Sequence, residues 1–160
     1  MFTAIIRTRG DYTLSILRLA LGTVFFAHGA QKMFGWYGGP GFDGTMQGFA
    51  QMGIPALLAF LAICAEFFGG IGLIVGLLGR IAALGIMINM NVAIAMVHAR
   101  FGFFMNWRGG QQGERFEYHL LTIGICLALL IGGSGALSID AALSRRASRK
   151  AGRIRGAKAA

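Results

Sequence analysis

Of the ionisable side chains inside long apolar stretches or at their ends, six could do chemistry: His28, Lys32, Glu66, His98, Glu117 and His119. A polar group among lipid tails is costly unless something satisfies it. These side chains must therefore face protein partners, a water-filled cavity or the membrane surface. Imidazole and ammonium groups can donate hydrogen bonds to carbonyl oxygens, and carboxylates can exchange protons.

Position along the helices divides the polar residues into two levels. At a rise of about 1.5 Å per residue, Glu66, Asn89 and Asn91 fall about 12–15 Å from the inner edge of their spans. The outer set falls about 21–28 Å from that edge and consists of His28, Lys32, His98 and His119.

The deep level centres on Glu66. An isolated ionised carboxylate is unstable in the middle of a bilayer, so Glu66 must pair or bind a proton. We expect Arg18 or an asparagine to be its partner, with Arg18 as a structural polar residue. Two interpretations stay open, a buried hydrogen-bonded link between helices and a carboxylate that handles protons or contacts a ligand.

The outer level predicts a polar pocket at the end of an apolar bundle. His28 and Lys32 are four residues apart and share a helix face, and Asn91 and His98 are seven apart. Such a pocket suits a lipophilic molecule with a polar head, such as a quinone. The predicted catalytic residues are Glu66, His98 and Glu117, and the predicted ligand-binding residues are His28, Lys32, Asn91 and His119.

Besides a ligand pocket, the three histidines allow two other interpretations. The three histidines come from different helices without local ligand spacing such as H-E-x-x-H, so no metal site is predicted. Histidines at the membrane interface that bind no ligand are the plain structural alternative.

Composition indicates an integral membrane protein. Of 160 residues, 56% are hydrophobic and only 13% are charged, and the mean hydropathy is +0.65. Four apolar runs, at about 14–34, 54–78, 81–98 and 118–137, are each long enough for a span of about 17–25 residues. They lack the polar face of a soluble helix. We therefore predict an all-α, four-helix transmembrane bundle.

Loop charges predict the orientation of the bundle. With both termini on one side, that side holds ten of the 15 basic residues, which places both termini in the cytoplasm. Residues 1–143 would form the transmembrane domain and residues 144–160 a basic tail. Ser138 or Asp140 would begin a short basic helix on the membrane surface. The two longer external loops could fold back over the outer mouth.

The basic tail bears on the partners of the protein. Seven basic residues follow residue 144 and would attract anionic lipid headgroups, whereas nucleic-acid binding is disfavoured because no recognition motif is present. Cys64 and Cys126 form no C-x-x-C pair, so nothing in their spacing indicates thiol–disulfide chemistry. A homo-oligomer stays open.

Several short motifs follow one another along the chain. They are H-G-x-x-K with F-G at His28–Gly35, a glutamate followed by glycines and G-L-x-x-R at Glu66–Arg80, a histidine and G-F-F at His98–Phe104, and G-x-G-x-x-S-x-D at Gly133–Asp140. Together with Arg18 and Glu117, they resemble the DoxX family of small four-helix membrane proteins. Ser134 stands where the family often has proline. The resemblance implies four spans with cytoplasmic termini, and in some members a link to quinone-dependent oxidoreductases.

The sequence thus predicts a multi-pass protein of a bacterial-type inner membrane. The leading hypothesis is a quinone-linked oxidoreductase or its membrane subunit. Because the sequence has no flavin, haem or iron–sulfur motif, a soluble or membrane redox partner would supply the electrons. The alternative is a non-enzymatic scaffold that anchors a soluble redox or stress-response protein through the basic tail.

Overall fold

Most of the described part of the chain is helical. The computed structural model describes residues 2–110 and 113–159, and it contains no strand within those ranges. Two residues of the second long loop and the last residue of the predicted tail lie outside the described residues. The elements are α1 (Phe2–Ile5), α2 (Tyr12–Phe34), η1 (Trp36–Gly38), α3 (Gly41–Gln51), α4 (Ala56–Val75), α5 (Gly79–Ala93), η2 (Ile94–His98), η3 (Ala99–Phe101), α6 (Glu117–Gly132) and α7 (Ile139–Ala159).

Three helical stretches are long and apolar enough to cross a membrane. They are α2, α4 and the continuous stretch from α5 to η3, which covers residues 79–101. The fourth predicted span corresponds to α6, an apolar helix of 16 residues. It ends earlier than predicted because Gly133 and Gly135 take positive φ angles of 84° and 80°, which turn the chain out of the helix. The all-helical membrane class is confirmed, and the fourth crossing stays a prediction.

The long helices pack in a closed order, with α2 against α4, α4 against α5, α5 against α6, and α6 against α2. The tightest contact joins α2 and α4. A Cβ on Gly29 would lie 2.4 Å from the backbone nitrogen of Phe67, and one on Gly70 would lie 2.4 Å from that of Phe26. The two backbones touch at these positions, so no larger residue fits.

Arg18 holds one end of this assembly together. Its side chain, 2% exposed, donates hydrogen bonds to the carbonyl oxygens of Leu73 and Ile74 (both 2.6 Å), Ser134 (2.8 Å) and Leu137. Leu73 and Ile74 lie in the last turn of α4, where carbonyls have no partner within the helix. The expected contact between Arg18 and Glu66 is therefore wrong, because the Arg18 guanidinium donates to these carbonyls instead.

Asp140 completes the same end. Its buried carboxylate accepts hydrogen bonds from the backbone N–H groups of Leu78 (3.0 Å) and Gly79 (3.1 Å) and from the Ser134 hydroxyl (2.6 Å). It thus caps the N-terminus of α5, whereas Ser138 caps α7, where its hydroxyl accepts the N–H three residues on (3.1 Å). The turn between α4 and α5 lies just before Gly79 rather than around Gly79 and Arg80.

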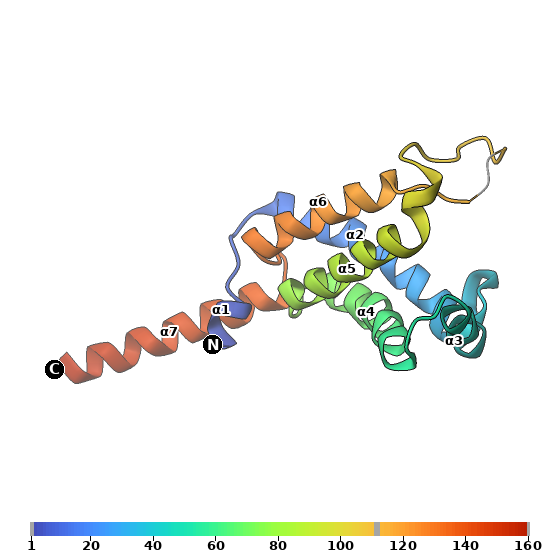
Figure 1. The fold of residues 1–160 in the computed structure, drawn as a ribbon. Helices are drawn as coiled ribbons and strands as arrows, with labels where there is room; N and C mark the ends of the chain where they lie inside the picture. Colours follow the sequence, from blue (N-terminus) through green and yellow to red (C-terminus); the bar gives the residue numbers. More distant parts are fainter. Residues whose placement is uncertain (1, 111–112, 160) are drawn as a thin grey trace.

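Two helices differ from the sequence predictions. The predicted first external loop contains α3, which packs on α2 and α4 at the end of the molecule away from the termini (Figure 1). Its glycines have low helix propensity, so the helix depends on packing. The basic helix α7 has 21 residues, not a few turns, and extends away from the packed helices (Figure 1). Its alanine, arginine and lysine residues favour continued helix.

The α2–α4 contact gives a stability prediction. We expect Gly29→Ala to destabilise the protein by about 1–3 kcal/mol, because the methyl group forces the two backbones apart. Gly124→Ala is the matched control, since nothing lies within 4 Å of a Cβ there. Thermal unfolding in one detergent measures both variants. Equal melting temperatures for the two would contradict backbone contact at Gly29.

Candidate functional site

A cavity of about 1290 Å³ lies along α4 and α5, with further walls from α2, the segment before α4 and the start of α6. Most of its lining is apolar. The polar lining residues lie around buried Glu66 and at one end of the cavity. They are His28, Lys32, Glu66, Asn89, His98, Glu114, Arg115, Tyr118 and His119. An apolar cavity with a few converging polar groups is the usual form of a small-molecule site.

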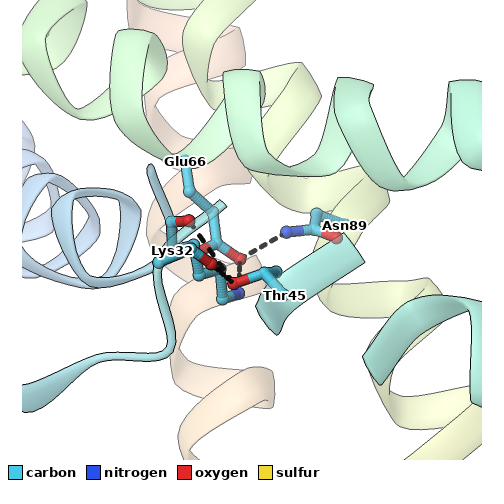
Figure 2. Close-up of polar contacts among 5 residues, drawn as sticks. Lys32, Thr45, Glu66 and Asn89 are labelled. Carbon is cyan, nitrogen blue, oxygen red and sulfur yellow. Dashed lines mark hydrogen bonds and ion pairs between the residues drawn. The ribbon is translucent and has the colours of Figure 1, made fainter. Parts of the chain in front are cut away.

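The buried point is a cluster of Lys32, Glu66 and Asn89, one residue from each of α2, α4 and α5. Figure 2 shows Lys32 and Asn89 approaching the same carboxylate oxygen. Lys32 Nζ donates to Glu66 Oε1 at 2.5 Å, and Asn89 Nδ2 donates to it at 2.6 Å. Glu66 is 2% exposed, and its other oxygen, Oε2, is buried with no hydrogen-bond partner among the described residues. The carboxylate therefore has a spare, buried acceptor on a residue that lines the cavity.

Local structure brings Lys32 to this cluster. Gly29, one turn earlier on α2, lies against the backbone of Glu66 and Phe67 and keeps α2 close to α4. The Thr45 hydroxyl donates to the Gly41 carbonyl within α3 (2.7 Å) and lies 3.4 Å from the Lys32 carbonyl, which places α3 against the end of α2 (Figure 2). The sequence placed Lys32 at the outer level, but its long side chain reaches inward to Glu66.

A second polar group lies where η2 meets α6. The rings of His98 and His119 are 4.1 Å apart between centroids, with planes inclined by 41°. Nδ1 of His98 lies 2.7 Å from the carbonyl oxygen of Glu114. Because a carbonyl only accepts, Nδ1 carries the hydrogen, and Nε2 of a neutral His98 is an acceptor. The second long loop thus orients this histidine.

Five of the seven predicted catalytic and ligand-binding residues line the cavity, namely His28, Lys32, Glu66, His98 and His119. Two are placed elsewhere. Asn91 donates to the Met87 carbonyl of its own helix (2.8 Å), and Glu117 accepts the backbone N–H of Met105 (2.9 Å). Neither belongs to the cavity lining, so Glu117 acts in the structure as an anchor for the second loop.

The predicted site omitted four polar residues of the lining, Asn89, Glu114, Arg115 and Tyr118. Of these, Asn89 contacts Glu66. Its depth matched that of Glu66, but depth alone did not distinguish it from Asn91. The two asparagines are about 200° apart around the helix at 3.6 residues per turn, so only one of them can face Glu66. Within the described ranges, no three His, Cys, Asp or Glu side chains come together as metal ligands.

Comparison with known proteins gives a consistent set of relatives. Residues 13–99 match the sequence pattern of the DoxX family. A Bacillus subtilis protein named "Putative oxidoreductase CatD" is 32% identical over 78% of this chain and 82% of its own length. The Escherichia coli inner membrane proteins YqjF and YphA are 34% and 31% identical, over 85% and 79% of this chain and 95% and 87% of their own lengths. No solved structure matches the chain significantly.

The ion pair between buried Glu66 and half-buried Lys32 gives a second stability prediction. Lys32→Met should destabilise the protein by about 3–5 kcal/mol, because it leaves the Glu66 carboxylate buried without its cation. Lys32→Met combined with Glu66→Gln should recover most of that loss, since no unpaired charge remains. Thermal unfolding checks both, with the exposed Lys150→Met as control. A double variant as unstable as the single one would show that the pair contributes little.

Proposed function

The chain belongs to the DoxX family, and from this premise we propose that it is a quinone-linked oxidoreductase or the membrane subunit of one. Its family, its relatives in the E. coli inner membrane and its three candidate spans make it a multi-pass protein of the bacterial inner membrane. The oxidoreductase name given to CatD supports the redox part of the proposal.

The proposed topology has four crossings with both termini in the cytoplasm. Helix α6, an apolar helix of 16 residues, is the fourth crossing. It is about 24 Å long at 1.5 Å per residue, which is short for a hydrocarbon layer of about 30 Å. The excess of basic residues on the side of the termini supports this orientation. Both long connections then lie on the outer side, at the end of the molecule opposite the termini (Figure 1).

The observation that carries the proposal is the spare oxygen of Glu66 beside an apolar cavity. A buried acceptor without a donor is costly, and a ligand hydroxyl can satisfy it. The reduced form of a quinone presents such a hydroxyl, and its carbonyl form accepts hydrogen bonds from groups such as Lys32 or His28. The long apolar lining suits the tail of the same molecule.

The residues around Glu66 and the pair of histidines have separate roles in this proposal. A bound quinone would supply two-electron, two-proton chemistry. Lys32 and Asn89 hold Glu66 in place, and Glu66 Oε2 is the atom that can take up or release a proton. His98 and His119 add acceptors and donors at the outer end of the cavity. Because the sequence carries no flavin, haem or iron–sulfur motif, a partner protein supplies the electrons.

Quinone content tests the proposal. The protein is purified in lipid nanodiscs, and extracted quinone is quantified per chain against empty discs. We expect stoichiometric quinone in the unmodified protein and at least about a tenfold loss in Asn89→Ala, because a hydrogen bond to a charged group contributes about 1.5–3 kcal/mol.

The matched control is Asn91→Ala, which removes the same side chain two residues away and outside the cavity. It should retain quinone. A His28→Ala/His98→Ala variant extends the test to the outer end of the cavity. Background quinone in the unmodified protein, or equal retention in Asn89→Ala and Asn91→Ala, would contradict a quinone site in this cavity.

The second candidate is a non-enzymatic scaffold, and α7 is the observation that favours it. This helix extends away from the packed helices (Figure 1). Four basic side chains along it are exposed, those of Arg145, Arg146, Arg149 and Lys150. A basic helix of this kind can dock a soluble partner with an acidic surface. The buried polar residues would then only hold helices together.

Truncation separates the two candidates. Removal of the residues after Leu143 should abolish partner-dependent function if the chain is a scaffold, whereas His98→Ala should act only through stability. In the quinone hypothesis the truncated protein retains its quinone and the His28→Ala/His98→Ala variant loses it. Quinone content and partner-dependent activity are measured on the same preparations.

A further inference from the structure

A second cleft, of about 840 Å³, lies at the other end of the molecule from α3, between the N-terminal segment, the start of α5 and α7. Arg7, Arg9 and Arg80 line it together with Thr8, and no acidic residue belongs to its lining. The nearest acidic residue along the N-terminal segment, Asp11, accepts the N–H of Thr13 and caps α2. The cleft therefore has a concentrated positive charge.

That charge is not neutralised within the described part of the chain. The pair of Lys32 and Glu66 is the one ion pair there. The side chains of Arg7 and Arg9 are exposed and make no hydrogen bond to another described residue. Arg80 is fixed differently, with its guanidinium donating to the carbonyls of Arg7, Leu130 and Ile131. Carbonyl partners leave the positive charge of Arg80 in place.

The backbone of the N-terminal segment is held firmly around the cleft. The N–H of Arg9 donates to the carbonyl of Gly132 (3.0 Å), and the hydroxyl of Thr8 accepts the N–H of Gly135 (2.7 Å). The arginine side chains therefore project from a fixed support. Opposite them, α7 presents a face of small residues, with Ser144, Ala147, Ser148 and Ala151 on the cleft wall, which leaves room for a bound group.

We propose that this cleft binds the phosphate headgroup of an anionic phospholipid. Arginine side chains match phosphate oxygens in charge and geometry. The cleft lies where three long helices begin or end, which is the level of lipid headgroups. Ile131 lines it and is 69% exposed, so an apolar side chain stands beside the arginines where the acyl chains would start. A free phosphate would not use that contact, whereas a phospholipid would.

Lipid retention in detergent tests this site. The purified full chain is mixed with phosphatidylglycerol or with phosphatidylcholine of the same acyl chains, and bound lipid is counted by native mass spectrometry. We expect phosphatidylglycerol to be retained preferentially, and Arg7→Gln/Arg9→Gln to weaken that retention about 10- to 30-fold. The fold should survive, because the hydrogen bonds at these two positions use backbone atoms.

The control removes the same charge from α7 outside the cleft, in Arg145→Gln/Arg149→Gln, and should change retention by less than about twofold. Equal losses in the two variants would overturn the site in favour of general charge attraction. Equal retention of the two lipids by the unmodified protein, or displacement of phosphatidylglycerol by millimolar inorganic phosphate, would also overturn it. These last two comparisons need no variant.

Discussion

The close approach of α2 and α4 is the constraint on which the rest of the structure depends. At Gly29 the two backbones touch, so the side chains that follow on α2 start within reach of those on α4. Lys32 can then meet Glu66 at 2.5 Å, and α5 joins the cluster through Asn89. In lipid, apolar surface gives no preference for one helix pairing over another, whereas close backbone packing and buried polar contacts do. Here the two occur within one helical turn.

The two ends of the packed helices are held by different means. At the end near the termini, Arg18 and Arg80 donate to carbonyls in the last turns of α4 and α6, and Asp140 accepts from the first N–H groups of α5. These contacts satisfy backbone groups that a helix end leaves open, so that end is fixed by its own structure. Deeper in the molecule, the polar residues of the cavity meet one another, and Glu66 Oε2 is left over. A buried oxygen without a partner at one place, and helix-end backbone groups with side-chain partners at the other, distinguish a candidate site from a structural join.

The sequence predicted the helices better than it predicted their contacts. Apolar runs and bilayer thickness located α2, α4 and α5, and the same reasoning singled out His28, Lys32, Glu66, His98 and His119, which line the cavity. Depth alone did not show which asparagine faces Glu66, because Asn89 and Asn91 lie at a similar depth but on different faces of the helix. The depth estimates also took no account of side-chain length, and the long side chain of Lys32 reaches inward to Glu66. Of the two partners expected for Glu66, an asparagine was right, since Asn89 bonds to it. Arg18 was wrong, because the carbonyls at the end of α4 were not counted as its acceptors.

The surroundings of the cavity limit what can enter it. Leu58, Phe68 and Ile88 line it and are 56%, 58% and 55% exposed, so its walls continue into the apolar outer surface of α4 and α5. In a bilayer that surface faces lipid tails, and a ligand approaching along it must already be dissolved in the membrane. Along this route a water-soluble substrate would have to cross apolar surface to reach Glu66, at a cost that a lipophilic molecule does not meet. The position of the carboxylate therefore favours a membrane-borne ligand with a short polar head.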